Sequence, residues 1–583
     1  MDLTRFRPFQ VTAHGLRQEL GLGAPPLATV LRWLAKADRR VMSIPVPTWA
    51  VASGVSALGI YALVLYLRAD VVLAYGDAVA HVYVARRVID SLTPGFAQLG
   101  TVWLPLPHIL MLPFVWNDTL WRTGLAGSIV SLVAFVLSAL YIYRTIHVLS
   151  GSGLAGVVGA ALFATNPNLL YMQATPMVET LTLFFIIATT YHLIRWADGG
   201  SLAQLVLSAA FALGGTLTRY EPCWLVPSGA AVVAVVCLRR YGLGRQLEGL
   251  TLAWAILPAY GIVLWLLYNQ IIFHDAFGFL GIGSAQMFAE ELEARGMLPA
   301  KGDPIGSAIL YGWAVIDVTG VPLVLASVAG FAALVVSRVP FGVKCATLLP
   351  ASLFLFEIVS LSGGQSAMLS PHSEIPGMVN TRYGLVLLPA VAIVAGVLAR
   401  PLRSWGVLLL VVALLPQLAI LPTPAGLASV QERILARAAL PGYSESWAES
   451  NFPLLRKDEG VILEEAVVIA DVRSQEIDPV AAWLREHARS GLILVAFWDN
   501  ASALMLESGF PLSRFIYVGN YPFFEEERRS PGLHSEWIVY RPEMAHDELR
   551  LPMVGGHPPG FRLVFEGGNL EIFRRVSESG RIE

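Results

Sequence analysis

The chain has 583 residues, of which 55% are hydrophobic and only 14% are charged, and its mean hydropathy is +0.61. This composition excludes an ordinary soluble protein of this size. The net charge of −3 and the lack of a Lys/Arg block argue against a nucleic-acid partner. The three cysteines, Cys223, Cys237 and Cys345, lie within or beside apolar stretches, so they predict neither a disulfide framework nor a metal site.

The first 44 residues do not have the pattern of a cleavable signal, because they contain scattered Arg and Pro residues and lie too far ahead of the first apolar run. We expect residues 1–44 to be a cytoplasmic, partly amphipathic lead-in. Apolar stretches then recur from position 48 to position 422. At about 20 residues per crossing they predict roughly eleven membrane spans. Residues 45–424 are therefore predicted to form a polytopic α-helical membrane domain.

The basic residues between these stretches predict the orientation of the chain. If the first span runs outward, the N-terminus and the turns rich in Lys and Arg all lie on the cytoplasmic side, as the positive-inside rule requires. These turns follow Arg144 and Arg195 or contain Arg239–Arg245, Arg338–Lys344 and Arg400–Arg403. The long loops 68–104, 274–305 and 362–382 then face outside, together with the short turns that precede Glu179 and follow Thr218.

The composition changes to that of a soluble protein after the last span, so residues 425–583 are predicted to be an extracytoplasmic α/β domain. An amphipathic helix is predicted over residues 477–489, and Gly567-Gly568 marks a hairpin turn. Strands are predicted for the remaining apolar runs. These are residues 466–471, 491–498, 514–519, 535–540 and the two arms of the pair 561–573.

The first outer loop contains YGDAVAHVYVARRVID, residues 75–90, directly after a predicted span. The composition favours a helix, on which Asp77 and His81 share a face one turn apart and can act on one substrate. Arg86 follows on the same segment. An aspartate after glycine is also a favoured helix cap, so a purely structural role for Asp77 is the alternative.

A second carboxylate, Glu179, lies at the outer start of the fourth predicted span. Ionisable groups at membrane depth are costly, which makes Glu179 a candidate catalytic residue beside Asp77. The alternative is that it only complements the positive end of a helix that starts after Pro176.

Two Arg-Tyr pairs occur where an outer loop meets a span, in TLTRYEPCW (216–224) and MVNTRYGLVLLP (378–389). Arginine suits phosphate binding through charged, directional hydrogen bonds. Both pairs also suit interface anchoring, and Glu221 is able simply to neutralise Arg219. The predicted substrate-binding set is His81, Arg86, Arg219, Tyr220, Glu221, Asn380, Arg382 and Tyr383.

The arrangement resembles the GT-C superfamily of membrane glycosyltransferases, such as protein O-mannosyltransferases and the lipid A aminoarabinose transferase. They share a first span and a long outer loop that carries an acidic residue, here Tyr75-Gly76-Asp77, followed by helices along the membrane, here residues 101–116. The mannosyltransferases typically have paired acids in this loop, whereas here a single Asp stands between Gly76 and Ala78. The WWD-type signature of oligosaccharyltransferases is absent from the chain, so transfer of one sugar is expected.

The resemblance implies an enzyme of the cell envelope with a polyprenyl-phosphate-linked sugar as donor and a protein, lipid or glycan hydroxyl as acceptor. Asp77 is the expected base of an inverting transfer on the outer face of a multi-pass cell-membrane protein. No cofactor is expected, although a divalent metal is a second option if Asp77 and Glu179 converge. The alternatives are a transporter or flippase of a lipid-linked glycan, and an O-antigen ligase or polymerase-like enzyme.

Overall fold

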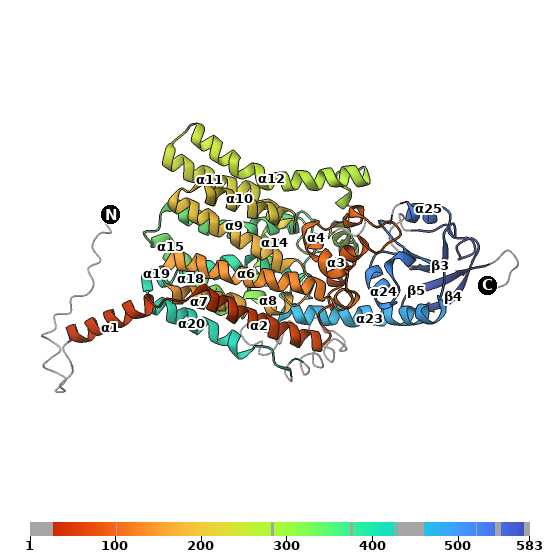
Figure 1. Cartoon of the computed structure of the whole chain (residues 1–583), viewed down its shortest axis with the longest axis horizontal. Coiled ribbons are helices and arrows are strands. Elements are labelled where there is room, and N and C mark those ends of the chain that lie inside the picture. Colours follow the sequence, from red (N-terminus) through yellow and green to blue (C-terminus); the bar gives the residue numbers. More distant parts are fainter. Residues whose placement is uncertain are drawn as a thin grey trace.

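The computed structural model describes residues 27–100, 102–280, 285–372, 377–424, 427, 460–520, 522–542 and 550–576. A bundle of helices makes up most of the molecule, and a small α/β unit from the C-terminal part of the chain caps one end of it (Figure 1). Helix α1 (Leu27–Met42) projects from the opposite end (Figure 1). The predicted class, a polytopic helical protein with a C-terminal α/β domain, is confirmed. Positions 1–26 of the expected lead-in lie outside the described residues.

Among the described residues, five helical segments are long and apolar enough to cross a membrane, or seven if two bent pairs each count as one span. About eleven were expected. The difference arises because several apolar stretches form helices well below the about 20 residues of a full crossing. The five are α2 (Thr48–Arg68), α6 (Leu125–Ser150), η2 with α11 (Glu221–Tyr241), α12 (Arg245–Phe273) and Thr381–Leu402. The bent pairs are α14 with α15 (Pro304–Thr319, Val321–Val336; 110°) and Phe341–Thr347 with Leu349–Ser362 (51°).

The remaining helices of the bundle are shorter or more polar. The segment Thr381–Leu402 consists of η5 (Thr381–Leu387), α18 (Leu388–Gly396) and α19 (Ala399–Leu402), and the second bent pair consists of α16 (Phe341–Thr347), η4 (Leu349–Ser352) and α17 (Leu353–Ser362). The others are α3 (Gly76–Arg87), η1 (Phe96–Leu99), α4 (Leu106–Val115), α5 (Asp118–Arg122), α7 (Gly153–Ala164), α8 (Pro167–Met172), α9 (Glu179–Gly199), α10 (Leu202–Thr216), η3 (Gly278–Leu280), α13 (Ala285–Ala294) and α20 (Ser404–Ala419).

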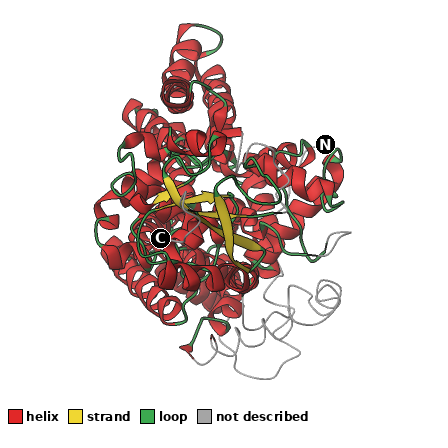
Figure 2. Ribbon diagram, turned by 90° about the vertical axis from the view of Figure 1, so that its right-hand side faces the viewer, coloured by secondary structure: helices red, strands yellow, loops and turns green. Residues whose placement is uncertain are grey.

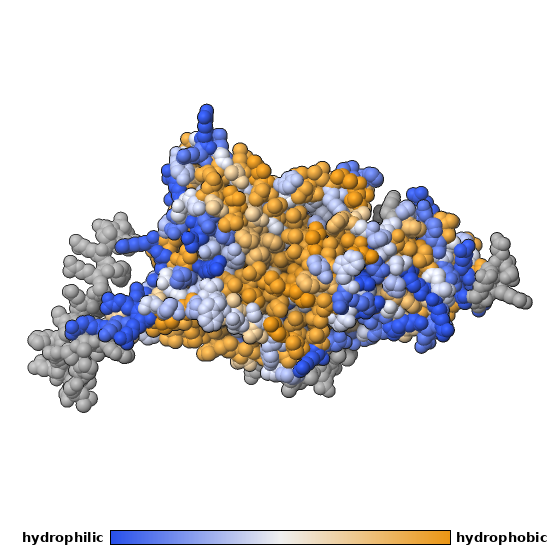
Figure 3. Space-filling model, in the orientation of Figure 1, coloured by the Kyte–Doolittle hydropathy of each residue, from blue (hydrophilic) through white to orange (hydrophobic). Residues whose placement is uncertain are grey.

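The surface of the bundle carries a broad apolar band between two hydrophilic ends (Figure 3). Large side chains such as Ile256, Ile271, Leu325 and Val328 are exposed on its helices. A soluble monomer rarely exposes so much contiguous apolar surface. The band therefore fits contact with lipid, and its two edges mark the two ends of the bundle.

The C-terminal unit is a five-stranded sheet with strand order β2-β1-β3-β5-β4. The strands β2, β1 and β3 are parallel, while β5 is antiparallel to both β3 and β4, so the sheet is mixed. The β4–β5 hairpin turns at Gly568 and Asn569, which both have positive φ, one residue later than predicted. Figure 2 looks onto this end of the molecule, where the strands lie in front of the helices. The elements are α23 (Val461–His487), β1 (Leu492–Ala496), α24 (Ala501–Glu507), η6 (Leu512–Arg514), β2 (Phe515–Ile516), α25 (Phe523–Arg529), β3 (Ser535–Tyr540), β4 (Phe561–Gly567) and β5 (Leu570–Arg575).

One predicted strand is wrong. Residues 466–471 belong to α23, which continues without a break through the helix predicted for residues 477–489 and ends at His487. The run AVVIAD is apolar over its first five positions, and such a run does not distinguish a buried strand from a buried helix. Its true partners are helices of the bundle, because α23 packs on α8 and on η5. The helix therefore extends from the bundle into the sheet domain (Figure 1).

The first outer loop lies between the bundle and the C-terminal unit. Val79, Val82 and Tyr83 of α3 share one apolar core with Ile493 and Leu494 of β1. The contact is also polar, because the Asp90 carboxylate accepts hydrogen bonds from the backbone N–H groups of Leu512 and Ser513. Helix α3 and the residues after it are thus attached to the C-terminal unit by apolar and polar contacts, which help to fix the position of Asp77 at the start of the helix.

Candidate functional site

Asp77 lies in the first turn of α3, but it is not the helix cap. The N-cap is Tyr75, and no side chain caps this helix end. The Asp77 carboxylate instead contacts Arg382, with 2.5 Å between Oδ2 and Nη2. These two residues are 305 positions apart in the chain. The capping alternative therefore does not account for this carboxylate.

Arg382 comes from η5, at the start of the segment Thr381–Leu402. Its guanidinium lies over the ring of Tyr75 at 4.9 Å and beside that of Tyr383 at 5.6 Å, both within the range of cation–π attraction. The chain enters η5 through Asn380, which has a left-handed backbone with φ of 56°. Asparagine tolerates this conformation better than most residues, so Asn380 shapes the turn that presents Arg382.

Glu179 joins the two arginines of the Arg-Tyr pairs. Its Oε1 lies 2.6 Å from Nη1 of Arg219 and 3.1 Å from Nε of Arg382. Arg219 also binds Glu221, with 2.5 Å between Nη2 and Oε1. Sequence-distant groups at the starts of α3, α9, η2 and η5 therefore meet in one charge cluster, which consists of Asp77, Glu179, Arg219, Glu221 and Arg382.

The members of the charge cluster differ in their access to solvent. The side chain of Asp77 is 37% exposed, whereas those of Arg382 and Glu179 are 8% and 1% exposed. Asp77 is therefore the carboxylate that a substrate can reach without rearrangement. Glu179 is a buried counter-charge that holds both guanidinium groups, as expected for a charge that is stable in an apolar setting only when paired.

Two atoms of the charge cluster keep unused hydrogen-bonding capacity. Within the described part of the chain, Nε of Arg382 and Oε2 of Glu179 are buried and make no hydrogen bond. The Nε atom is near Glu179 Oε1, but the pair is only an ion contact and lacks hydrogen-bond geometry. Buried polar groups are normally satisfied, so a free donor beside an exposed carboxylate suits a polar ligand.

His81 lies one turn after Asp77 and is buried against aromatic residues. Its Nδ1 is 3.0 Å from Nε2 of His108, and its ring is 5.0 Å from that of Trp103. Burial, followed by the charges of Arg219 and Arg382, lowers the pKa of His81 to about 3. Burial also lowers the pKa of His108 well below its usual value. Both imidazoles are therefore neutral near pH 7, and one of them donates the shared hydrogen bond.

Three other predicted substrate-binding residues have their polar atoms engaged elsewhere. Arg86 donates to the Val115 carbonyl at 2.6 Å and pairs with Asp90. The Tyr220 hydroxyl donates to the Val102 carbonyl at 2.7 Å, and the Asn380 side chain donates to the Ala367 carbonyl at 2.9 Å. The structure thus brings Asp77, Glu179, Arg219, Glu221, Arg382 and Tyr383 together, and it gives Arg86, Tyr220 and Asn380 local partners in the outer loops.

Sequence reasoning missed three residues around the site. Glu465 of α23 accepts hydrogen bonds from Asn380 and Thr381, directly before Arg382. Tyr75 forms one wall of the Arg382 site, and His108 pairs with His81. A signal for Glu465 was available, because Glu464-Glu465 interrupts the apolar run VILEEAVVIA in the same way as the charges already singled out.

No group of three or more His, Cys, Asp or Glu side chains is arranged to hold a metal ion in the described ranges. Metal-independent catalysis stays a prediction.

The sequence of this chain matches the family model described as dolichyl-phosphate-mannose-protein mannosyltransferase over residues 121–265. The predicted resemblance to GT-C glycosyltransferases is confirmed. The matched segment contains Glu179, Arg219 and Glu221 of the charge cluster, while Asp77 and Arg382 lie outside it. The matched family consists of sugar-transferring enzymes, in agreement with the predicted glycosyltransferase. A search of curated proteins finds no match.

Solved structures of similar fold include ArnT and an archaeal oligosaccharyltransferase. ArnT from Cupriavidus metallidurans, bound to undecaprenyl phosphate, has a TM-score of 0.49 and 13% identity, with 90% of this chain and 99% of that chain covered. The apo oligosaccharyltransferase from Archaeoglobus fulgidus has a TM-score of 0.47 and 10% identity, with 85% and 69% covered. The Archaeoglobus fulgidus enzyme AglB, in complex with an inhibitory peptide and a dolichol-phosphate, has a TM-score of 0.44 and 11% identity, with 84% and 69% covered.

Proposed function

We propose that this GT-C-like chain is an integral membrane glycosyltransferase that moves a single sugar from a polyprenyl-phosphate-linked donor to an acceptor hydroxyl. The observation that carries the proposal is the pairing of the exposed Asp77 carboxylate with Arg382, which has a buried, unused Nε donor. A base and a phosphate-binding cation side by side are what a transfer from a sugar phosphate requires. The family-model match and the lipid-phosphate-bound relatives support the same class of donor.

In the proposed reaction the acceptor oxygen attacks the anomeric carbon on the side opposite the phosphate. The bond between that carbon and the phosphate oxygen breaks, and the lipid phosphate leaves with the electron pair. Asp77 takes the proton of the acceptor hydroxyl, and the configuration at the anomeric carbon inverts. The phosphate gains negative charge as it leaves, so cations held in place before the reaction stabilise the transition state.

The two arginines have different parts in this scheme. Arg382 binds the donor phosphate with Nε and the N–H groups that Asp77 does not use, because a guanidinium offers five donors. Arg219 is farther from Asp77 along the cluster and is compensated by both Glu179 and Glu221. It therefore acts as the counter-charge that holds Glu179 in place, and Glu179 in turn orients Arg382.

The reaction takes place on the outer face in this proposal, and the acceptor is a protein, lipid or glycan. The basic turns assigned to the cytoplasm are near α1, since Arg403 binds Asp38 of α1 and Arg400 donates to the Leu149 carbonyl at 2.7 Å. The positive-inside rule makes that end cytoplasmic. The C-terminal unit caps the other end, and α3 with Asp77 packs against it (Figure 1).

The charge distribution favours a transferase over a transporter. Transporters place ionisable groups near the bilayer midplane on broken helices. In this chain each cluster residue stands within two positions of the first residue of a helical element, at the starts of α3, α9, η2 and η5. Such a position suits a substrate at the membrane surface.

The test is single-turnover transfer of labelled sugar from synthetic polyprenyl-phosphate donors to a cell-envelope extract. Asp77→Asn is expected to slow the transfer step by roughly 10²-fold or more, the contribution of a positioned base, while undecaprenyl phosphate binding persists because Arg382 is intact. The control is Asp70→Asn in the same loop, an exposed residue with φ of 58° that asparagine tolerates. Undiminished transfer by Asp77→Asn contradicts the role of Asp77, and no transfer by the wild type from any donor contradicts the proposed function.

A further inference from the structure

Helix α23 connects the two segments that carry the central pair of the site. It begins inside the bundle, where Val461–Val467 are all buried and the backbone N–H of Ile462 donates to Asn168 Oδ1 at 3.1 Å. It then runs into the C-terminal unit, where Ile477, Val480 and Leu484 belong to the core of the sheet domain (Figure 1). A single helix, which contains Pro479 in its second half, therefore extends past the segments that carry Asp77 and Arg382.

The first attachment is Glu465, which holds the segment before Arg382. Glu465 is only 2% exposed. One carboxylate oxygen accepts from the backbone N–H of Asn380 at 2.8 Å, and the other accepts from the backbone N–H of Thr381 at 3.1 Å and its hydroxyl at 2.5 Å. Both oxygens are thus used at the start of η5, where a carboxylate is favoured by the free N–H groups of the helix end.

The second attachment is Arg473, which holds the segment before Asp77. Its Nη1 donates to the Ala74 carbonyl at 3.0 Å and its Nη2 to the Leu73 carbonyl at 2.8 Å. The next residue, Tyr75, donates its hydroxyl to the Ile462 carbonyl at 3.2 Å. The Asp77 loop is therefore bound to α23 at two places, Ile462 and Arg473, which flank Glu465 along the helix.

Both attachments use charged side chains on backbone groups. A buried charge costs desolvation free energy and adds little net stability compared with an apolar residue. The presence of charged residues at these two positions therefore suits a positional role. Glu465 and Arg473 are eight residues apart, or roughly 12 Å along a helix at 1.5 Å per residue. Because Arg473 binds the segment before Asp77 and Glu465 binds the segment before Arg382, this length of helix sets the distance between the two segments.

We propose that Glu465 and Arg473 are positioning residues that set the separation of Asp77 and Arg382, and that α23 couples the C-terminal domain to the site in this way. This inference rests on the proposed transferase function. The two residues touch no reacting atom. They act through the loops that present the base and the phosphate-binding cation, for which a misplacement of about 1 Å is able to cost roughly 10²-fold in rate.

The activity test uses the full-length protein in lipid nanodiscs. Glu465→Gln keeps the size of the side chain but leaves one acceptor oxygen instead of two, and Arg473→Lys keeps the charge but loses the two-pronged contact. Each is expected to lower the single-turnover rate at saturating donor by about tenfold or more. Undecaprenyl phosphate affinity should change little in Arg473→Lys, whereas Glu465→Gln, which releases the segment before Arg382, should also weaken it. Glu486→Gln, at an exposed position of the same helix, is the matched control and should keep the wild-type rate.

A double-variant comparison separates positioning from a general loss of structure. In the Asp77→Asn background, Arg473→Lys should lower the residual rate by less than about twofold, since the base whose segment Arg473 holds is already absent. A rate loss of the same factor in both backgrounds overturns the proposal. A rate loss equal to the loss of folded protein, measured by thermal unfolding and size-exclusion chromatography, overturns it as well.

A second readout does not depend on any enzymatic activity. Asp77→Cys and Arg382→Cys are combined in a background where Cys223, Cys237 and Cys345 are replaced by serine, and the pair is cross-linked with a short bifunctional thiol reagent. Adding Glu465→Gln or Arg473→Lys should lower the cross-linking yield severalfold, whereas Glu486→Gln should not. Unchanged cross-linking overturns the positioning role. If cross-linking falls as expected but the wild type transfers no sugar, the proposed function fails while the mechanical role of α23 stands.

Discussion

Asp77 and Glu179 are both carboxylates bound to Arg382, yet their surroundings give them different chemistry. Asp77 is more than one-third exposed and stands in the first turn of a helix, whereas Glu179 is buried and shared between two guanidinium groups. A proton acceptor needs access to the acceptor hydroxyl, and a counter-charge needs a fixed place. The two predicted catalytic residues therefore differ in their access to solvent. Asp77 is able to meet the acceptor hydroxyl, and Glu179 orients Arg382.

His81 allows a prediction on the pH dependence of stability. Its pKa is lowered to about 3 by burial and by the charges of Arg219 and Arg382, while that of an unfolded histidine is about 6.5. The unfolded chain therefore binds a proton that the folded chain rejects, so His81 destabilises the fold progressively as the pH falls from about 6.5 toward about 3. Thermal unfolding in detergent at pH 7.5 and pH 5 should show a smaller loss for His81→Gln than for the wild type.

The control for this prediction is His487→Gln, which removes an exposed histidine near the end of α23. It should leave the loss of stability between the two pH values as large as in the wild type. An equal loss in His81→Gln and the wild type would contradict the assignment. Glutamine is a suitable replacement because it is able to keep a hydrogen bond to His108 without titrating.

At the scale of elements, α15 and α18 pack closely enough to depend on one glycine. A Cβ atom at Gly330 of α15 would lie 2.1 Å from the Val394 carbonyl oxygen of α18, so even alanine forces the helices apart. Gly330→Ala is expected to destabilise the bundle by about 1–3 kcal/mol, as overpacking does in other cores. Gly312→Ala in α14 has open space around the added methyl group and should be neutral or stabilising, since glycine weakens a helix interior.

Thermal unfolding of both glycine variants in the same detergent measures the difference. A midpoint for Gly330→Ala equal to that of Gly312→Ala would show that α15 and α18 are not in tight contact. The comparison uses the same chemical change in two apolar helices, so a general effect of replacing glycine in the membrane cancels.

The elements also show which parts of the fold the sequence could predict. The strand over residues 535–540 and the hairpin near Gly568 were predicted because period, length and turn residues agree there. The strand expected over residues 466–471 failed because the identity of that apolar run depends on its partners, α8 and η5, which are distant in the sequence.

For the same reason, the sequence predicts individual residues of the candidate site but not the contacts between them. Asp77, Glu179, Arg219 and Arg382 were found because each is a charge at the edge of an apolar stretch, a pattern visible in one segment at a time. Their mutual contacts have no local signal, because they join residues 40 positions apart for Glu179 and Arg219 and 305 positions apart for Asp77 and Arg382. Glu465 was missed because the incorrect strand obscured its place on a helix that faces the bundle.

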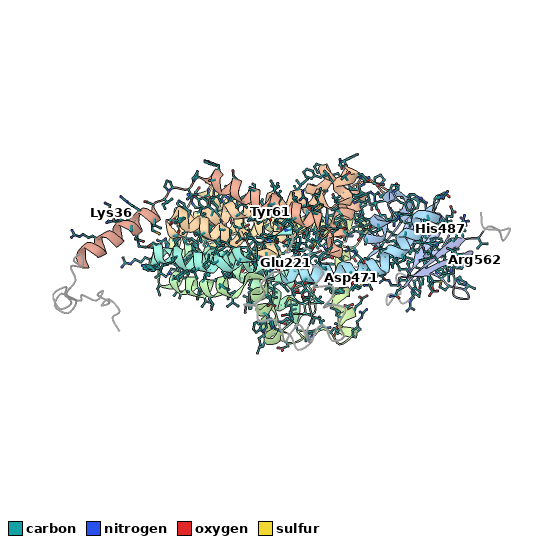
Figure 4. All side chains as sticks on the ribbon, turned by 90° about the horizontal axis from the view of Figure 1, so that it is seen from below. Lys36, Tyr61, Glu221, Asp471, His487 and Arg562 are labelled. Carbon is teal, nitrogen blue, oxygen red and sulfur yellow. The ribbon has the colours of Figure 1, made fainter. Side chains whose placement is uncertain are left out.

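For the whole molecule, the hydropathy of the surface changes along the long axis of the bundle. Basic residues near α1 occupy one end, the apolar band forms the middle, and the sheet domain occupies the other end (Figures 1 and 3). Such a molecule is expected to lie with its long axis across the membrane, because polar surface at both ends must stay in water while the band contacts lipid. Lys36 and Arg562 lie at the two extremes of this axis (Figure 4).

The orientation is tested with single cysteines at these two extremes, in a background where the three native cysteines are replaced by serine. Both Lys36 and Arg562 are exposed, so Lys36→Cys and Arg562→Cys should be accessible to reagents and harmless to the fold. A membrane-impermeant maleimide applied to intact cells, or to spheroplasts where an outer barrier exists, should label Arg562→Cys. Lys36→Cys should be labelled only after permeabilisation, because the basic end of the bundle is expected in the cytoplasm. Labelling of both positions from the same side would contradict the arrangement of the bundle. Labelling of Lys36→Cys alone in intact cells would be consistent with the arrangement, but it would place Asp77 and its substrates on the opposite side of the membrane.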